Sequence, residues 1–304
     1  MNTMHTAAIG PVTVGPDDLA GWTERTCWRY KIAQLWARYM PRAKGWFPRQ
    51  MGSRLGRGVR NLTRTAGGAK LAMDPRNWDI YCAIGNARGT WDAPVLDASC
   101  RFLKPGDIFY DIGANVGFMA IEASNRYADQ ISVVAFEPQP GLARLIAVSA
   151  ALNGFKNLKT FAVMLGKDPG EGDLFVPSHS IHASAVSRSS NAQVLHCPKT
   201  TIDQMLAQNL IPAPTVIKID VEGAEWDVFR GAAQTISTHR PAIIFESDCN
   251  TARFGYGRRE LCAYLRELGD YEFFAVQPDG IQRMENLMED ESVRDMAAVP
   301  AGRL

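Results

Sequence analysis

The sequence has few of the features that mark secreted, metal-stabilised or membrane-spanning proteins. Its six cysteines are scattered over 304 residues without a C-x-x-C pair or a zinc-type spacing, so we expect reduced thiols and no dedicated metal site. No apolar run approaches the roughly 20 residues that a membrane helix needs. The first residues also lack a basic segment followed by an apolar stretch. These absences predict a cytoplasmic protein without a secretory signal or a membrane-spanning segment.

The chain also lacks an excess of charge of either sign. Its 33 basic and 32 acidic residues give a formal net charge of +1, so we expect no nucleic-acid partner. One segment is an exception, because residues 41–70 contain eight Lys or Arg residues and no Asp or Glu. Two interpretations stay open for it: a weak contact with an anionic membrane surface, or a basic arm or lid that packs loosely on the rest of the protein.

The residues that are present have an ordinary globular balance, with 46% apolar and 21% charged, which allows a sizeable core. The composition changes near residue 75. Before it, apolar residues recur at helical spacing from Trp28 to Tyr39, and Pro41 ends the pattern. We therefore predict two parts, a basic and mostly helical extension over residues 1–75 and a larger domain over residues 76–304.

The larger part alternates short apolar runs with longer segments of helical spacing. The short runs, rich in Val, Ile or Phe, predict buried strands at 107–112, 132–137, 158–164, 215–220 and 241–246. Helices are predicted between them at 117–127, 141–152 and 222–237. This order is typical of a parallel α/β sheet with helices on both faces. Such sheets bind their ligands at the carboxyl ends of the strands, so we expect the site there.

A glycine-containing turn follows the first of these strands, in the segment Asp111-Ile-Gly113-Ala-Asn115-Val-Gly117. Glycine lets the backbone approach a ligand closely because it has no Cβ. The second strand ends at Glu137 and Pro138, twenty residues after the turn. A carboxylate in that place can accept hydrogen bonds from both hydroxyls of a ribose. The two segments together predict a site for a cofactor that contains a nucleoside.

The choice of cofactor depends on the glycine turn. A pyrophosphate is bound by the pattern G-x-G-x-x-G, whose amides neutralise the phosphates. Counted from Gly113, the second and third glycine positions hold Asn115 and Phe118. S-adenosylmethionine has no phosphate, and its ammonium and sulfonium favour an acidic residue such as Asp111. The pattern therefore favours S-adenosylmethionine, with a nicotinamide-dependent oxidoreductase as the alternative.

Further motifs follow these two in the chain: Leu152-Asn-Gly154, Thr200-Thr-Ile-Asp203, Ile217-Lys-Ile-Asp-Val-Glu-Gly-Ala-Glu225 and Arg240-Pro-Ala-Ile-Ile-Phe-Glu246. In this order, over roughly residues 80–300, the sequence resembles the FkbM family of methyltransferases. The resemblance implies a Rossmann-like class I methyltransferase fold, with a seven-stranded sheet whose last strand is antiparallel. It also implies S-adenosylmethionine as cofactor and O-methylation of a sugar, a polyketide or another secondary metabolite.

The same resemblance implies roles for the residues of the turn and of the strand ends. Asp111, Gly113 and Asn115 would contact the methionine part of the cofactor, and Gly117 of the same turn is also a predicted cofactor-binding residue. Glu137, followed by Pro138, would bind the ribose. The end of the third strand, at Val163 and Met164, would lie near the adenine.

The reaction centre is expected at the end of the fourth strand. Methyl transfer depends mostly on positioning, and an aliphatic hydroxyl also needs a base or a metal ion. Lys218 and Asp220 are two residues apart, so their side chains point to one face of the strand. Asp220 is the candidate base, and Lys218 either sets its orientation and pKa or makes a structural ion pair. Glu222 and Glu246 are the next candidates, whereas Glu225 is more typical of a residue that stabilises a helix dipole.

The segment 177–198 separates the third and fourth strands, and its length and Ser/His content predict a loop over the site. His179 or His182 is an alternative base, since an unperturbed histidine titrates at about 6.5. A surface residue without a role is the commoner interpretation of any one of these histidines, His196 included.

Other functions are less well supported by the sequence. An N-methyltransferase often carries an Asn/Asp-Pro-Pro-Tyr/Phe turn where this chain has Asp220-Val-Glu-Gly. A binding module without chemistry would be expected to replace Asp111, Glu137 or Asp220 by apolar residues, and all three are present. A metal held by Asp220, Glu222 and Glu246 with a histidine stays an alternative without a tight ligand motif. The sequence thus favours an enzyme that methylates a hydroxyl of a small-molecule acceptor.

Overall fold

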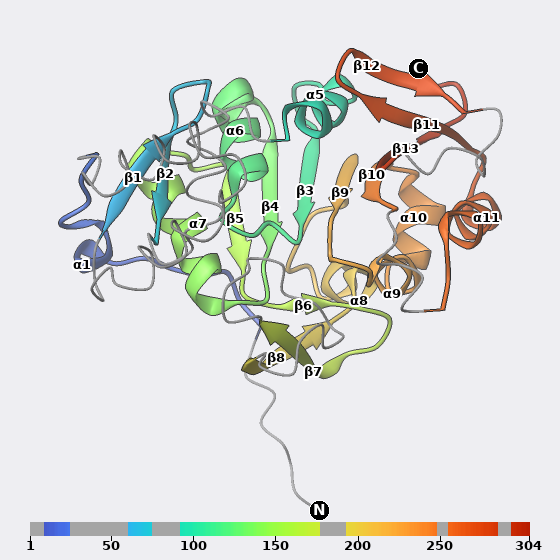
Figure 1. Cartoon of the computed structure of the whole chain (residues 1–304). Helices are drawn as coiled ribbons and strands as arrows, with labels where there is room; N and C mark the ends of the chain where they lie inside the picture. The colour runs from blue at the N-terminus through green and yellow to red at the C-terminus, as the bar shows by residue number, and fades with distance from the viewer. Residues whose placement is uncertain (1–8, 25–59, 75–91, 177–192, 248–254, 285–292) are drawn as a thin grey trace, which may run out of the picture.

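The computed structural model describes residues 9–24, 60–74, 92–176, 193–247, 255–284 and 293–304 (Figure 1). These residues form a large central sheet with helices on both faces, a small three-stranded sheet and an N-terminal hairpin. The helix predicted from Trp28 to Tyr39 lies outside the described residues, as does most of the basic segment.

The central sheet has eight strands in the order β12-β11-β13-β10-β9-β3-β4-β5. The predicted strands form its parallel part: β3 (Ile108–Ile112), β4 (Ser132–Phe136), β5 (Leu158–Phe161), β9 (Val216–Ile219) and β10 (Ala242–Glu246). The last strand, β13 (Asp295–Pro300), is antiparallel to both of its neighbours, β10 and β11 (Tyr271–Gln277). The predicted fold class, a Rossmann-like α/β sheet with an antiparallel last strand, is confirmed.

The number of strands differs from the predicted seven. After β11 the chain reverses at Pro278 and Asp279 and returns as β12 (Gly280–Arg283), which pairs antiparallel with β11. Proline favours the first central position of a tight turn and glycine the residue that follows the turn, and Gly280 has a φ of +133° that favours glycine. This hairpin adds the eighth strand at the edge of the sheet far from β3.

Side chains alternate along the central strands and fill two separate cores. On one face, Phe109 and Val133 pack with residues of α5, α6 and α7. On the other face, Tyr110 and Val134 pack with residues of α8, α9, α10 and α11. The helices of the first face are α5 (Ala93–Arg101), α6 (Phe118–Tyr127) and α7 (Pro140–Asn153), and those of the second are α8 (Ile202–Ala207), α9 (Glu225–Arg230), α10 (Ala233–His239) and α11 (Arg258–Leu268).

The predicted helix 222–237 is two helices, α9 and α10. Glu222 has a left-handed φ of +57°, so the first helix begins after it. α9 ends before Gly231, where an added Cβ would lie 2.0 Å from the carbonyl oxygen of Gly166. The carboxylate of Asp203 accepts hydrogen bonds from two backbone N–H groups in the first turn of α10. A close backbone contact and a new N-terminal cap therefore interrupt the helix.

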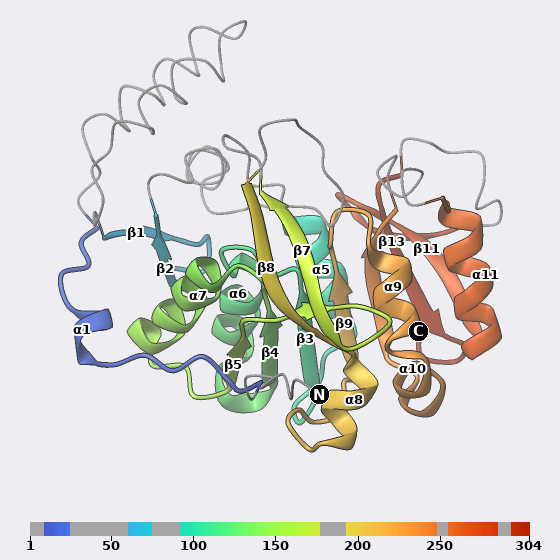
Figure 2. The same cartoon turned by 90° about the horizontal axis from the view of Figure 1, so that it is seen from below.

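The smaller sheet lies beyond the carboxyl ends of the central strands. It consists of β6 (Met164–Leu165), β8 (Gln193–Thr200) and β7 (Gly170–Val176) in that order, and Figure 2 shows β7 and β8 running across this end of the molecule. Two predictions are corrected here. The predicted strand 158–164 ends at Phe161, because Met164 pairs with β8 instead. The predicted loop 177–198 is a strand from Gln193 onward, because these residues pair with β7.

The described residues before residue 75 pack on the rest of the protein. It contains the short helix α1 (Pro16–Leu19) and a hairpin of β1 (Asn61–Arg64) and β2 (Lys70–Met73). The Ser149 hydroxyl on α7 accepts a hydrogen bond from the backbone N–H of Ala72 in β2, at 2.8 Å. The backbone N–H of Val12 donates to the carbonyl of Thr160 in β5, at 2.7 Å. Within the described ranges, no helix is both long and apolar enough to cross a membrane.

Candidate active site

A cavity of about 730 Å³ lies at the carboxyl ends of β3, β4 and β9, between these strand ends and the smaller sheet. Most of the predicted site residues line it: Gly113, Asn115, Glu137, Pro138, Val163, Met164, Lys218, Asp220 and Glu222. Asp111 and Gly117 do not line it. His179 lies outside the described residues.

Glu137 directly follows β4 and is 4% exposed. Its two carboxylate oxygens accept hydrogen bonds from the backbone N–H groups of Asn115 and Gln139, each at 2.9 Å. Burial raises the pKa of Glu137 to about 7, although both N–H groups favour the charged form. The turns after β3 and β4 thus fix this carboxylate, and each oxygen keeps a lone pair for a ligand donor.

The glycines of the turn after β3 are needed for packing inside the protein. Gly113 has a φ of +72°, and an added Cβ would lie 1.9 Å from the backbone carbonyl oxygen of Asp220. Gly117 has a φ of +84°, and an added Cβ would lie 2.7 Å from the side chain of Ile146 in α7. Packing inside the protein therefore requires both glycines, while Gly113 also lines the cavity, so the contact of this turn with a cofactor stays a prediction.

Asn115 lies in the same turn with a φ of +53°, a conformation that asparagine tolerates better than most residues. Its side-chain Oδ1 is buried and has no hydrogen-bond partner among the described residues. Leaving such an acceptor without a partner costs about 1–3 kcal/mol. Because Asn115 lines the cavity, this oxygen is a candidate acceptor for a ligand N–H or O–H.

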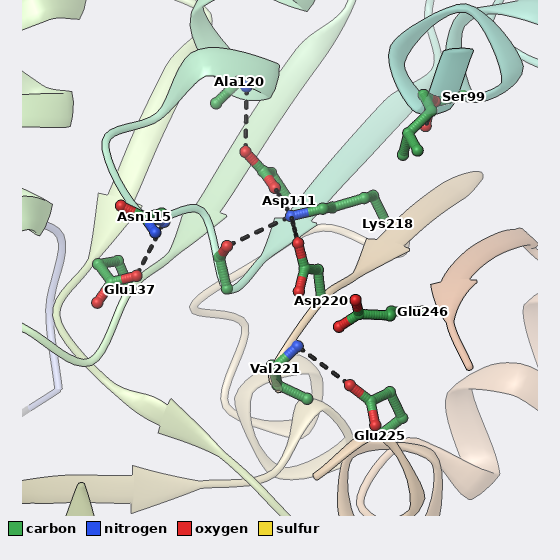
Figure 3. A network of polar contacts seen from close by, with 12 residues as sticks. Ser99, Asp111, Asn115, Ala120, Glu137, Lys218, Asp220, Val221, Glu225 and Glu246 are labelled. Atoms are coloured by element: carbon green, nitrogen blue, oxygen red, sulfur yellow. Dashed lines mark hydrogen bonds and ion pairs between the residues drawn. The ribbon is translucent and has the colours of Figure 1, made fainter. Parts of the chain in front are cut away.

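Lys218 connects the ends of β3 and β9 (Figure 3). Its Nζ lies 3.2 Å from Oδ1 of Asp111 and 3.7 Å from Oδ2 of Asp220, and it donates to the carbonyl oxygen of Gly113 at 3.3 Å. Burial acts to lower the pKa of Lys218, but the carboxylates of Asp111 and Asp220 outweigh it and raise the pKa above its usual range. Lys218 is therefore an ammonium that faces three oxygens, and the ion pair also orients Asp220.

Asp111 is fully buried behind this lysine. Its Oδ2 accepts a hydrogen bond from the backbone N–H of Ala120 in the first turn of α6, at 3.1 Å. Asp111 and Lys218 are direct partners in the register of β3 and β9, which explains the contact of their side chains. Lys218 stands in the cavity wall and Asp111 behind it, and a contact of Asp111 with a cofactor stays a prediction.

A second buried glutamate, Glu225, shapes the loop that follows β9. Its Oε1 accepts hydrogen bonds from the backbone N–H groups of Val221 (3.2 Å) and Gly223 (3.1 Å), and the Tyr256 hydroxyl donates to its Oε2 at 3.3 Å. Burial raises the pKa of Glu225 to about 7. Glu225 does not line the cavity, so its position supports a structural role.

Three carboxylates beside the end of β9 do line the cavity: those of Asp220, Glu222 and Asp227. The Asp220 side chain is 32% exposed. Glu246, another predicted candidate, is buried, forms an ion pair with Arg294 and stands outside the cavity wall. Within the part of the chain that the structure describes, no group of three or more His, Cys, Asp or Glu residues is arranged to hold a metal ion.

Of the histidines of segment 177–198, the structure describes His196. His196 lies on β8, is exposed, and its Nδ1 is 2.6 Å from a carboxylate oxygen of Asp173 on β7. It does not line the cavity. His179 and His182 lie outside the described residues, and a role for either as the base stays a prediction.

Sequence reasoning missed the contribution of β7, whose residues 171–175 line the cavity. This segment, Gly-Glu-Gly-Asp-Leu-Phe-Val, has two glycines and only a short apolar end, so it carries no strand signal of its own. It becomes a strand through its pairing with β8. Asp227 was also missed, although its place in the first turn of α9 follows from a helix that begins near Glu225.

The chain is similar to known proteins. The family model described as methyltransferase FkbM domain matches residues 111–271, more than half of the chain. The hexuronic acid methyltransferase AglP of Haloferax volcanii is 26% identical over 162 residues, which cover 53% of this chain and 64% of that protein. The chain thus spans less than two thirds of the length of this curated relative.

Solved structures of methyltransferases are also similar. The methyltransferase FkbM of Methylobacillus flagellatus has a TM-score of 0.42 and 18% identity, over 64% of this chain and 43% of its own. A SAM-dependent O-methyltransferase of Thermotoga maritima has a TM-score of 0.38 and 14% identity, over 79% of this chain and 77% of its own.

Proposed function

The chain belongs to the FkbM family of methyltransferases, and from this premise we propose that it transfers the methyl group of S-adenosylmethionine to a hydroxyl of a sugar or a similar small metabolite. One observation carries the proposal: a single cavity is lined by Asn115 and Glu137 and also by Asp220 and Glu222. β3 lies between β4 and β9 in the sheet. Glu137, the candidate residue for binding the ribose, and Asp220, the candidate base, therefore lie on either side of the turn that follows β3.

The residues near the end of β4 fit the cofactor. S-adenosylmethionine, when bound, supplies a methyl group on a positively charged sulfonium. Glu137 would accept hydrogen bonds from the ribose hydroxyls, since each of its oxygens has one backbone donor. The buried Oδ1 of Asn115 would accept a hydrogen bond from the ammonium. Val163, which lies between β5 and β6, and Met164, the first residue of β6, would offer an apolar surface to the adenine.

In this proposal Asp220, which lines the cavity, would take the proton of the acceptor hydroxyl. Its Oδ2 faces the ammonium of Lys218, so its Oδ1 is left for the acceptor. Lys218 would act as a positioning residue, because the ion pair orients the carboxylate of Asp220. A base of this kind typically contributes 10²–10⁴-fold to the rate. Glu222, on the same loop, is the second candidate.

The class of acceptor is supported by the curated relative, whose name assigns it a hexuronic acid. A sugar offers the aliphatic hydroxyl for which a carboxylate base is needed. Transfer to nitrogen is the alternative outcome. The loop after β9 does not favour it, since Glu225 and not a Pro-Pro turn shapes the backbone there.

Two measurements on the full-length protein test the proposal. The first is calorimetric titration with S-adenosylmethionine and, separately, with NAD, each with and without EDTA. We expect binding of S-adenosylmethionine alone, unaffected by EDTA, whereas a preference for NAD or binding of neither would contradict the cofactor assignment. The second is transfer of a labelled methyl group to a panel of sugars and glycosides, with mass spectrometry to locate the label. Label on nitrogen would contradict O-methylation.

A further inference from the structure

Lys199 lies on β8 and lines the cavity, but no step of the proposed function uses it. Two other basic residues of the lining, Lys218 and Arg294, face carboxylates of the protein. Within the described ranges, the Lys199 side chain has no hydrogen-bond or ion-pair partner. A lysine ammonium has three donors and no acceptor, so Lys199 is a candidate donor to a ligand.

The apolar stem of Lys199 is held by packing against two glycines of the cavity wall. A Cβ added to Gly166 would lie 3.3 Å from the Lys199 Cδ, and a Cβ added to Gly172 would lie 3.5 Å from the same atom. The Cβ added to Gly172 would also lie 2.6 Å from the sulfur of Met164, so Lys199 and Met164 pack around this glycine. Lysine typically packs its stem in this way while its ammonium stays with polar partners or water. The packed stem therefore limits the region that the ammonium can reach.

A neighbour of Lys199 on β8 indicates the direction in which its side chain points. Alternate residues of a strand project to the same face, so Lys199 and Cys197 share one face of β8. Cys197 is buried, and its thiol donates to the carbonyl oxygen of Pro138, with 3.5 Å between the sulfur and the oxygen. Pro138 directly follows Glu137, the residue assigned to the ribose. Lys199 therefore projects from the face of β8 that lies against the end of β4.

The pairing of β8 with β6 places Lys199 beside the residues assigned to the adenine. Lys199 and Met164 are direct partners in the register of these two strands. Lys199 thus lies next to Met164 and on the face of β8 that is turned toward Glu137. The adenine is attached to the ribose, so a base whose ribose is bound by Glu137 and whose ring packs on Met164 would lie beside the Lys199 ammonium.

Building on the proposed function, we infer that Lys199 is a further cofactor-binding residue, whose ammonium donates a hydrogen bond to a ring nitrogen of the adenine. The ring nitrogens of adenine that carry no substituent are acceptors, whereas the amino group of the base is a donor and cannot pair with an ammonium. The hydrogen bond would add one polar contact to the apolar surface of Val163 and Met164. A polar contact within a mostly apolar pocket fixes the orientation of a ligand.

The test uses S-adenosylhomocysteine and its 1-deaza, 3-deaza and 7-deaza analogues, each of which replaces one acceptor nitrogen of the adenine by C–H. Their affinities for the full-length protein are measured by calorimetric titration at pH 7. We expect one analogue to bind about 5–30-fold more weakly than S-adenosylhomocysteine, because it lacks the acceptor for Lys199. This loss is smaller than a fully buried hydrogen bond to a charged group would give, since Lys199 is only half-buried.

Lys199→Met makes the test specific, because it keeps an unbranched apolar stem and removes the ammonium. The variant should bind S-adenosylhomocysteine about 5–30-fold more weakly than the wild type, and it should no longer distinguish S-adenosylhomocysteine from that same analogue. Lys167→Met is the matched control. Lys167 is exposed, lies two residues after β6 and does not line the cavity, so this change should alter none of the four affinities by more than about twofold.

The outcomes separate the two proposals. If the wild-type protein bound all three analogues as tightly as S-adenosylhomocysteine, the inference would be overturned and the cofactor assignment would stay intact; this comparison needs no variant. An equal loss for the same analogue in the wild type and in Lys199→Met would also overturn the inference, since the missing acceptor would then have another donor. Failure of S-adenosylhomocysteine itself to bind would contradict the proposed cofactor, and the inference with it.

Discussion

Two buried glutamates of this protein, Glu137 and Glu225, have similar surroundings but differ in their position relative to the cavity. Glu137 follows β4 and Glu225 follows the loop after β9. Each accepts hydrogen bonds from two backbone N–H groups, and burial raises the pKa of each to about 7. Only Glu137 lines the cavity, and only Glu225 has the Tyr256 hydroxyl as a further donor.

The comparison teaches that burial and a shifted pKa do not identify a functional carboxylate. The criterion that separates the two residues is the direction in which unused lone pairs point. Glu137 lines the cavity and can accept further hydrogen bonds there. Glu225 does not line the cavity, and it accepts hydrogen bonds from two backbone N–H groups and the Tyr256 hydroxyl. The predictions below are arranged to test this difference.

The largest effect is expected on turnover, from a change of Asp220. This residue begins the loop after β9, whose backbone N–H groups donate to Glu225. Asp220→Asn keeps the size of the side chain and removes the base, so turnover should fall by about 10²–10⁴-fold. Cofactor affinity should stay within about twofold, because the residues assigned to the cofactor are intact. Turnover is measured with labelled S-adenosylmethionine and affinity by calorimetry. An unchanged rate would remove Asp220 from the chemistry.

A smaller effect is expected on cofactor affinity. Glu137→Ala removes the acceptor for two ribose hydroxyls and should weaken S-adenosylmethionine binding by about 10–100-fold, at roughly 1.5–3 kcal/mol for hydrogen bonds to a charged group. Glu225→Ala serves as the matched comparison in the same titration. It should weaken binding by less than about threefold, and equal losses in the two variants would break the distinction drawn here.

Glu225→Ala should instead destabilise the fold. Its loss leaves the backbone N–H groups of Val221 and Gly223 without an acceptor, at a cost of about 1–3 kcal/mol in the free energy of unfolding. Urea denaturation followed by circular dichroism measures the change. A Tyr256→Phe variant, which keeps the ring, should give a smaller loss. Wild-type stability in Glu225→Ala would show that the loop does not depend on this residue.

The smallest effect concerns pH. The pKa of Glu137 is about 7 in the protein without ligand, and its charged form is the better acceptor for ribose hydroxyls. Cofactor affinity should therefore increase as pH rises from 6 to 8, by less than about tenfold, and then level off. Glu137→Gln should bind more weakly with a flat profile over this range. A wild-type affinity that decreased over the same interval would contradict the assignment.

Much of the fold could be predicted because local signals and tertiary structure agree. The parallel strands, the positions of Glu137 and Asp220 at strand ends and the antiparallel last strand all follow from short apolar runs and from the family resemblance. The local sequence patterns gave wrong predictions where contacts between distant segments determine the secondary structure. The helix over 222–237 is interrupted by Gly166 and Asp203, and β7 exists only as a partner of β8.

The site was predictable in its residues and less so in their contacts. The motif Asp111-Ile-Gly113 marked the correct turn, yet Asp111 is covered by Lys218, whose place depends on the register of β3 with β9. The pairing of Asp111 with Lys218 cannot be predicted from the spacing of residues within the motif of either strand. The lining by Glu171 and Asp173 was hidden for the same reason, since the smaller sheet assembles from segments without a common sequence signal.

The contact at Gly113 limits how two distant segments of the chain can change in evolution. Because Gly113 has no side chain, the carbonyl of Asp220 can occupy the space beside it. Mutations in the turn after β3 and in the loop after β9 therefore affect each other. A substitution at Gly113 would displace the candidate base, and a change in the later loop would leave the earlier turn without its partner. Hybrid chains that join the first half of one family member to the second half of another should therefore be functional only when both halves share this junction.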